Sequence, residues 1–248
     1  MKLLAIGNSF SQDATTFLYQ ILQAAGVECE INNLYIGGCP LEKHWKNIEE
    51  DLPEYLLQVN GVSTERMVSI RQMLEEGNWD IIVTQQASGF SGWKDSYEPF
   101  LGNMLEYLRK MAPEAKIFLH ETWAYETDST HTHFARYNRS QQEMYARLED
   151  AYCSMAEKYQ LPMIRSGKLV QAIRQQPRYA SRELCICRDG FHMHYIYGRY
   201  ATACAWAKTL FGVNVTGNAY IPVTEKLPDE QADLQILADL QKLVDEIC

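Results

Sequence analysis

The chain has 248 residues, of which 46% are hydrophobic and 22% are charged, and this composition is typical of a globular domain with a large buried core. No apolar run approaches the ~18 residues needed to cross a bilayer, so a membrane-spanning segment is excluded. The net charge of −9 repels phosphate backbones and anionic lipid surfaces, and we expect neither nucleic acid nor a membrane as a partner.

Short apolar runs alternate with amphipathic stretches along the chain, a pattern typical of βα units on a parallel sheet. The apolar runs predict five buried strands, at Leu3–Ile6, Ile31–Ile36, Asp80–Thr84, Lys116–His120 and Pro162–Ile164. Helical spacing of apolar residues predicts helices at about residues 12–25, 42–58, 64–76, 96–111, 134–159, 193–211 and 229–246. The stretch from Pro177 to Phe191 has no periodicity and is expected to be a surface loop. No repeat or linker interrupts the pattern, so we expect one α/β domain over residues 1–248 with a central five-stranded parallel sheet.

The cysteines and the first residues bear on the cellular compartment. Seven cysteines form an odd set without the spacing of a disulfide framework, which predicts reduced thiols. The four apolar residues before Gly7 are too few for the hydrophobic region of a signal peptide. We therefore expect a cytoplasmic protein, or an exported one if a preceding signal has been removed.

Four loops carry residues suited to chemistry. In a doubly wound sheet the loops after the strands meet at one edge, where such folds hold their ligands. Three of the loops follow predicted strands and the fourth lies near the C-terminus: Gly7-Asn8-Ser9, Gly37-Gly38-Cys39-Pro40, Gln85-Gln86-Ala87-Ser88-Gly89 and Asp189-Gly190-Phe191-His192. Together they supply a nucleophile, a glycine turn, carboxamides and an acid–base pair.

Ser9 is a candidate nucleophile, because a serine hydroxyl becomes reactive when a histidine, which titrates near pH ~6.5, takes its proton. His192 is the candidate base, and Asp189, three residues earlier, can fix its tautomer and stabilise the imidazolium. A structural interpretation remains open for each motif. Ser9 or Ser11 could cap the helix that follows, and Asp189 could cap a helix that starts near Met193.

Acyl transfer also needs hydrogen-bond donors for the oxyanion, each worth roughly 3–4 kcal/mol. Gly38 can bring its N–H close to a ligand because it has no Cβ, and a carboxamide from Gln85 or Gln86 can donate without adding charge. A tight turn explains Gly37-Gly38 equally well. Two glutamines at the end of a buried strand are harder to explain structurally, because burying unpaired amides costs several kcal/mol.

The motifs resemble those of the SGNH (GDSL-like) hydrolases, which are esterases and lipases on a flavodoxin-like three-layer α/β fold. The GNS of residues 7–9 is similar to the first block of that family, with Asn8 where aspartate is commoner. The resemblance implies that Ser9 is the nucleophile. The GG of residues 37–38 is similar to the second block and implies that Gly38 lends a backbone N–H to the oxyanion hole.

The resemblance extends from about residue 3 to residue 211. The DGFH of residues 189–192 is similar to the fifth block, which implies Asp189 as the orienting acid and His192 as the base. The third block departs from the usual GxND, because this chain has TQQASG; an amide from Gln85 or Gln86 would then replace that of the asparagine. The HETWAY and DGFHMHYIYGRYA stretches resemble an uncharacterised branch of gut-bacterial proteins.

Two aromatic residues and two arginines are candidates for binding a substrate. Trp123 and Tyr125 follow the fourth predicted strand, where their rings could line the mouth of a pocket and stack on sugars, or could simply cover the edge of the sheet. Arg136 and Arg139 could hold a substrate carboxylate, although charges on one side of a helix normally form a solvated face.

Two histidine pairs raise the question of a metal. His131 with His133 and His192 with His194 have the spacing of zinc ligands on a strand. Residues two apart on a helix point in diverging directions, so we expect no metal.

These features predict a serine esterase that needs no cofactor and hydrolyses short-acyl esters of a small molecule or carbohydrate, with acetyl as the expected acyl group. Two alternatives remain open: a non-catalytic carbohydrate-binding protein on the same fold, and a metal-dependent hydrolase that uses the two histidine pairs. The sequence does not indicate an oligomeric state.

Overall fold

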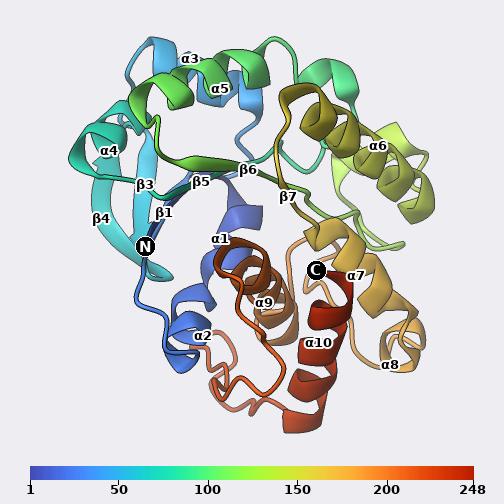
Figure 1. The fold of residues 1–248 in the computed structure, drawn as a ribbon. Coiled ribbons are helices and arrows are strands. Elements are labelled where there is room, and N and C mark those ends of the chain that lie inside the picture. The colour runs from blue at the N-terminus through green and yellow to red at the C-terminus, as the bar shows by residue number, and fades with distance from the viewer.

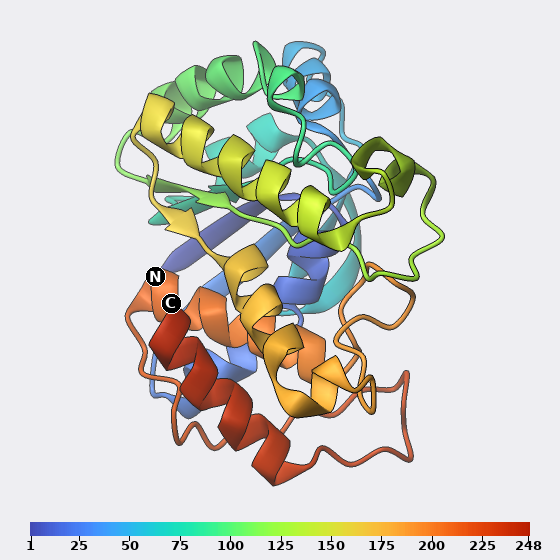
Figure 2. The same cartoon turned by 90° about the vertical axis from the view of Figure 1, so that its right-hand side faces the viewer.

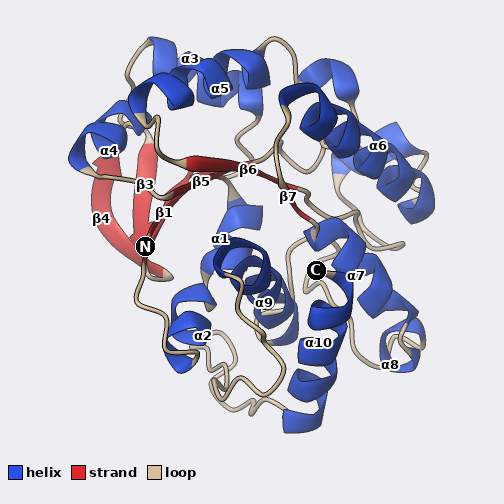
Figure 3. Ribbon diagram, viewed as in Figure 1, coloured by secondary structure: helices blue, strands red, loops and turns tan.

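A seven-stranded sheet crosses the middle of the computed structural model, which describes residues 1–248 (Figure 1). Its strand order is β4-β3-β2-β1-β5-β6-β7. The five strands β2, β1, β5, β6 and β7 run parallel in the flavodoxin-like order, while β3 and β4 are antiparallel (Figure 3). The strands are β1 Lys2–Gly7, β2 Glu30–Tyr35, β3 Tyr55–Val59, β4 Val62–Val68, β5 Ile81–Thr84, β6 Lys116–His120 and β7 Met163–Ile164.

Helices cover both faces of the sheet, because alternate residues of each buried strand point to opposite sides. Leu3 and Ala5 of β1 pack against α1, α2, α7, α9 and α10, whereas Leu4 and Ile6 pack against α3, α4, α5 and α6 (Figure 1). The helices are α1 Ser9–Thr15, α2 Leu18–Ala24, α3 Leu41–Glu49, α4 Ile70–Glu76, α5 Phe100–Met111, α6 Gln141–Tyr159, α7 Ser166–Gln175, α8 Pro177–Ala180, α9 Tyr197–Phe211 and α10 Leu234–Ile247, with short 3-10 turns η1 Lys94–Ser96 and η2 Thr132–Tyr137. None of these helices is both long and apolar enough to cross a membrane.

The sheet has two more strands than predicted. The five predicted strands are all present and parallel, but β3 and β4 occupy residues that were expected to belong to helices at 42–58 and 64–76. Asn60 and Gly61 join these two strands with φ values of 53° and 83°. An Asn-Gly pair with positive φ at both residues is the usual two-residue hairpin turn, and it places β4 beside β3 as the edge strand of the sheet.

Several helix boundaries also differ from the prediction. The helix expected at 12–25 is two short helices, of which the first begins at Ser9. The helix expected at 134–159 is interrupted at Asn138 and Arg139, whose φ values of 53° and 51° end the η2 turn before α6 begins at Gln141. The helix α7 was not predicted, and the expected loop from Pro177 to Phe191 contains only the single turn α8.

Two histidines are fully buried and affect stability. Burial lowers the pKa of His44 and of His120 to about 3. An unfolded histidine titrates near pH ~6.5, so the unfolded chain binds protons that the folded chain does not. The free energy of unfolding is therefore unaffected by these histidines above pH ~6.5. It decreases as the pH falls from there toward 3.

We expect His44→Gln to reduce this sensitivity to acid. His44 lies in α3, where its Nδ1 is 2.8 Å from the hydroxyl of Tyr55. At pH 5 one such histidine lowers the free energy of unfolding by about 2 kcal/mol relative to its value at pH 7.5. Urea unfolding at the two pH values measures the difference in unfolding free energy. The wild type should lose about 2 kcal/mol more than His44→Gln; equal losses in the two proteins would contradict the assignment.

Candidate active site

The turn between β1 and α1 presents Ser9 at the carboxyl edge of the sheet. Asn8 is the N-cap of α1, and its side-chain oxygen accepts a hydrogen bond from the Phe10 N–H at 3.0 Å. The hydroxyl of Ser11, with its single hydrogen, lies between two acceptors, the Asn8 carbonyl at 2.9 Å and Asn33 Oδ1 at 2.7 Å. The helix is thus capped by Asn8 and not by Ser9 or Ser11, and the half-buried Ser9 hydroxyl is left for another partner.

That partner is His192, which lies 183 residues further along the chain. The Ser9 Oγ and the His192 Nε2 are 2.8 Å apart, and the His192 Nδ1 is 2.7 Å from Asp189 Oδ2. The other oxygen of Asp189 accepts backbone N–H bonds from Phe191 at 3.2 Å and from His192 at 2.8 Å. The helix α9 begins only at Tyr197, so Asp189 does not cap a helix starting near Met193 as the alternative interpretation required.

The charge on Asp189 fixes the tautomer of His192. Burial acts to raise the pKa of Asp189, but the hydrogen bonds from the ring and backbone of His192 outweigh it and hold the pKa below its usual value. The carboxylate is then a pure acceptor, so the Nδ1 of His192 carries the proton that it donates. This leaves the Nε2 lone pair facing the Ser9 hydroxyl.

A buried carboxylate that the sequence analysis did not identify, that of Asp13, connects the helix of Ser9 to the loop of His192. Asp13 lies on α1 one turn after Ser9 and has no exposed surface. It accepts hydrogen bonds from Arg199 Nε at 2.8 Å, from Arg188 Nη1 at 3.1 Å and from the Met193 N–H at 2.8 Å. Arg188 directly precedes Asp189, and Met193 directly follows His192. The helix that carries the serine is therefore held to one end of the His192 loop by an ion pair and to the other end by a backbone hydrogen bond.

The His192 loop is closed by backbone bonds as well. The Arg188 N–H donates to the His192 carbonyl at 2.9 Å, and the His194 N–H donates to the Ile186 carbonyl at 2.7 Å. The indole N–H of Trp123 donates to the Phe191 carbonyl at 2.7 Å. These contacts hold the loop in one conformation, which is the condition for a base to stay within reach of its nucleophile.

Two backbone N–H groups, in the serine turn and in the Gly37-Gly38 turn tied to it, are not hydrogen-bonded within the protein. The Asn8 side chain donates to the Cys39 carbonyl at 3.1 Å and so ties the Gly37-Gly38 turn to the serine turn. Gly38 adopts a φ of +63°, and no atom lies within 4 Å of the place where a Cβ would be. The N–H groups of Ser9 and Gly38 have no acceptor in the protein.

The carboxamides of Gln85 and Gln86 are used inside the protein instead. The Gln85 Nε2 donates to Asn8 Oδ1 at 2.8 Å, and the Gln86 Nε2 donates to the Ser96 carbonyl at 2.9 Å. The Gln86 Oε1 accepts from the Leu41 N–H at 3.0 Å. Both side chains are buried. We therefore correct the expectation for Gln86, whose amide nitrogen already contacts both the carbonyl and the hydroxyl of Ser96. Gln85 uses one of its two amide hydrogens, so its donation to an oxyanion stays a prediction. Both side chains fix the loops next to Ser9.

Gln85 belongs to a buried chain of polar groups that extends to α7. Its Oε1 is 2.5 Å from the Nδ1 of His120, and the Nε2 of His120 is 2.9 Å from the hydroxyl of Ser166. The amide oxygen can only accept, so His120 carries its proton on Nδ1 and accepts from Ser166. Every polar atom of this chain has a partner, which makes the Asn8 turn rigid.

Trp123 and Tyr125 lie behind the site and not at its mouth. Both rings have no exposed surface. Trp123 stacks on Phe10 with 4.2 Å between ring centroids, and the Tyr125 hydroxyl is 2.9 Å from Ser88 Oγ. No sugar can stack on either ring in this conformation, so the expectation that they bind substrate directly is corrected. They pack behind the His192 loop.

One histidine of each pair, His131 or His194, accepts a local backbone N–H. The Nδ1 of His131 accepts the His133 N–H at 3.2 Å, and the Nδ1 of His194 accepts the Ile196 N–H at 3.2 Å. No group of three or more His, Cys, Asp or Glu side chains is placed to hold a metal ion. The residues of the pairs thus do not form the site that a metal-dependent hydrolase would use.

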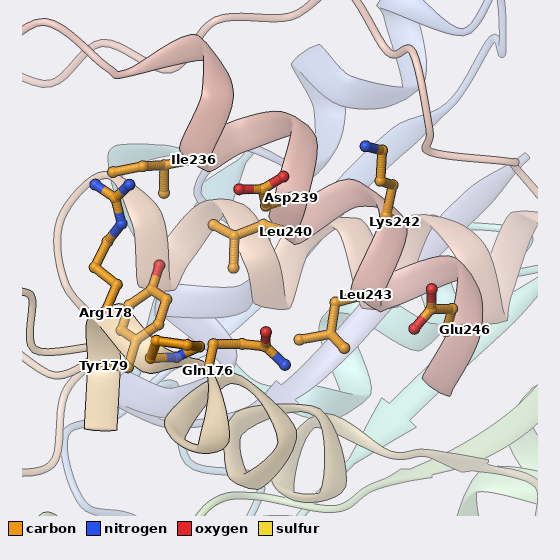
Figure 4. A pocket seen from close by; sticks show the side chains of 10 residues that line it. Gln176, Arg178, Tyr179, Ile236, Asp239, Leu240, Lys242, Leu243 and Glu246 are labelled. Atoms are coloured by element: carbon orange, nitrogen blue, oxygen red, sulfur yellow. The ribbon is translucent and has the colours of Figure 1, made fainter. Parts of the chain in front are cut away.

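A cavity of about 390 Å³ lies between α8 and α10, away from Ser9 (Figure 4). Tyr179 and Gln176 line it on one side, and Leu240 and Leu243 line it on the other. It contains none of the residues described above. The cavity is therefore separate from the contacts of Ser9 and His192.

Comparison with known proteins supports the fold and identifies the family. A family model described as "Domain of unknown function (DUF4886)" matches residues 2–237. The crystal structure of a DUF4886 family protein from Bacteroides uniformis is 36% identical, with 99% of this chain and 93% of that chain covered and a TM-score of 0.89. No curated protein matches the chain.

More distant structures share the fold. A putative SGNH hydrolase from Slackia heliotrinireducens is 18% identical, with 85% of this chain and 98% of that chain covered and a TM-score of 0.60. Axe2, an acetylxylan esterase from Geobacillus stearothermophilus, is 13% identical, with 84% of this chain and 93% of that chain covered and a TM-score of 0.56. The predicted SGNH hydrolase fold is thereby confirmed.

Proposed function

The chain belongs to the DUF4886 family, and we propose that it is a serine esterase in which Ser9, His192 and Asp189 form the catalytic triad. The observation that carries the proposal is the hydrogen-bonded series from Ser9 Oγ through His192 to Asp189, with both contacts shorter than 3 Å. The series lies at the carboxyl edge of a sheet of the fold shared with a putative SGNH hydrolase and an acetylxylan esterase. The proposed nucleophile thus comes from one end of the chain, and the proposed base and orienting acid come from the other.

The chemistry follows from these positions. The Ser9 hydroxyl gives its proton to the His192 Nε2 while its oxygen attacks the ester carbonyl carbon. The backbone N–H groups of Ser9 and Gly38 donate to the oxyanion that forms. Collapse of the tetrahedral intermediate expels the alcohol, which takes the proton from Nε2. A water molecule then attacks the acyl-enzyme by the same route, and the acid and the free serine are released.

We propose a short acyl group, acetyl above all, on a carbohydrate alcohol. The exposure of the site supports this choice: the Asp189 side chain is 43% exposed next to His192, and no long apolar segment is available to cover a lipid chain. The acetylxylan esterase on the same fold acts on an acetyl ester of a carbohydrate, as its name states.

A panel of esters tests this assignment. We expect the wild type to hydrolyse p-nitrophenyl acetate and acetylated sugars at least about tenfold faster, in kcat/KM, than p-nitrophenyl octanoate, because a missing apolar pocket forfeits about 1 kcal/mol or more of binding to a long chain. Excess chelator should leave the rates unchanged. A preference for octanoate would refute the short acyl group, and loss of activity with chelator would favour a metal-dependent hydrolase.

A further inference from the structure

A second cavity, of about 280 Å³, lies between the loop after β5 and the η2 turn. Trp93 and Lys94 line it from the loop, and Arg136 and Arg147 line it from the other side. The volume falls just below the 300–1,000 Å³ of most small-molecule sites and matches a group the size of one sugar ring. Three of its lining side chains are cationic and one, Asp95, is acidic, in a chain whose net charge is −9.

Only one of these cations is free to bind an anion. Lys94 pairs with Asp150 at 2.6 Å, and Arg147 pairs with Glu143. Arg136 has no carboxylate within 4 Å of its guanidinium. An unpaired guanidinium in a cavity is a receptor for a carboxylate, because its planar N–H groups match the two carboxylate oxygens.

Arg136 is held in place without a counterion. Its guanidinium lies 4.3 Å from the centroid of the Phe90 ring and 5.1 Å from that of Trp93, and its Nη1 reaches the Gly89 carbonyl at 3.4 Å. Stacking fixes the plane of the guanidinium and leaves its other N–H groups unused. Trp93 is 47% exposed, an unusual exposure for so large an apolar ring. An exposed indole beside a fixed cation can stack on a sugar while the arginine binds its acidic group.

A row of half-buried rings connects this cavity to the candidate base. The Phe90 ring packs edge-on against His133 at 5.2 Å between centroids, and His133 lies 5.3 Å from His131. The His131 ring is 4.7 Å from Phe191, the residue that precedes His192. Figure 2 shows the 132–137 turn and the loop that precedes α9 on the same side of the molecule. Packed rings therefore link the η2 side of the cavity to the loop that carries His192.

We propose that the substrate is an ester of an acidic carbohydrate. The carboxylate of a uronic-acid-type sugar binds Arg136, its ring stacks on Trp93, and a neighbouring sugar brings its acyl ester to Ser9. For hydrolysis of the ester, this inference rests on the proposed esterase function. For recognition of the acidic sugar, it rests on the cavity around Arg136.

The activity test uses a matched pair of substrates. One is an acetylated oligosaccharide that contains a uronic acid, and the other is the same oligosaccharide after its carboxyl group has been reduced to a hydroxymethyl group. We expect kcat/KM to favour the acid by about tenfold and Arg136→Met to abolish this preference. Arg139→Met is the control, since Arg139 lies outside the cavity, and it should keep the preference. A wild type without preference would overturn the inference, as would a preference that survives Arg136→Met.

A binding test separates this inference from the esterase proposal. Ser9→Ala protein is titrated with the deacetylated acidic oligosaccharide and with its reduced form, and tryptophan fluorescence is followed. We expect the acidic form alone to change the fluorescence, with Trp93→Phe removing the change and 0.5 M salt weakening the binding. If the wild type hydrolyses no ester, the proposed function fails and this titration still decides the binding site. Equal binding of both oligosaccharides would overturn the site even if the esterase is active.

Discussion

Replacing Ser9 by alanine is expected to lower kcat/KM for p-nitrophenyl acetate by roughly 10⁴–10⁶-fold, with the fold unchanged. The Ser9 hydroxyl makes its contact with His192 and is not needed to cap α1, because Asn8 performs that role. Its removal therefore eliminates the nucleophile and leaves the local structure intact. Steady-state hydrolysis and thermal unfolding of both proteins measure the two effects.

Ser11→Ala is the matched control, because Ser11 lies on the same helix two residues away. Its hydroxyl bonds only to Asn8 and Asn33, so its loss should cost about 1 kcal/mol of stability and less than threefold in kcat/KM. Similar activity in Ser9→Ala and the wild type would remove Ser9 from the mechanism. A larger loss of activity in Ser11→Ala would instead indicate that the helix start, and not the Ser9 hydroxyl, is what matters.

Asp13→Asn is expected to lower kcat about 10²-fold with KM nearly unchanged. The variant keeps the shape of the side chain but removes the charge that pairs with Arg188 and Arg199. These guanidiniums hold the loop that contains His192, and a displacement of about 1 Å between base and nucleophile costs on the order of 10² in rate. Removing one partner of a buried ion pair also costs about 3–5 kcal/mol of stability. Kinetics at a temperature where circular dichroism shows a folded protein separate the two effects.

Asp245→Asn provides a control for general destabilisation. Asp245 lies on α10, pairs with Lys208 at 2.9 Å and accepts the Thr216 N–H at 2.8 Å, and it contacts no residue of the His192 loop. It should lose stability while kcat stays within about twofold of the wild type. If Asp13→Asn keeps wild-type kcat, or if both variants lose kcat in proportion to their stability, Asp13 has no positioning role.

The parallel strands could be predicted because most of them are short apolar runs; β2, which carries Asn32 and Asn33, is the exception. The strand β4 was not predicted, for the opposite reason. Most residues of β4 are exposed, as befits an edge strand, so no alternation of apolar and polar residues marks them as a strand. The available signal was Asn60-Gly61, a pair that favours a two-residue hairpin turn even where the flanking pattern is weak.

The candidate triad was predictable because each of its motifs is local. Ser9 follows a buried strand directly, and Asp189 and His192 are three residues apart. The ion pairs of Asp13 with Arg188 and Arg199 span 175 and 186 residues, and no pattern within one segment indicates such a contact. The burial of Trp123 could not be predicted from the sequence either, because an aromatic residue after a strand can cover a core or line a pocket. Only the packing of Phe10 against it decides between these positions.

The most direct test of the account is covalent labelling of the protein with a fluorophosphonate probe. The probe reacts with a serine only when a base activates its hydroxyl and donors hold the phosphonyl oxygen, as in acyl transfer. We predict one adduct per chain in the intact mass, located on Ser9 by peptide mapping and strongly reduced in His192→Gln. An unlabelled wild type, or an adduct on another residue, would contradict the claim that Ser9 and His192 form a working nucleophile and base.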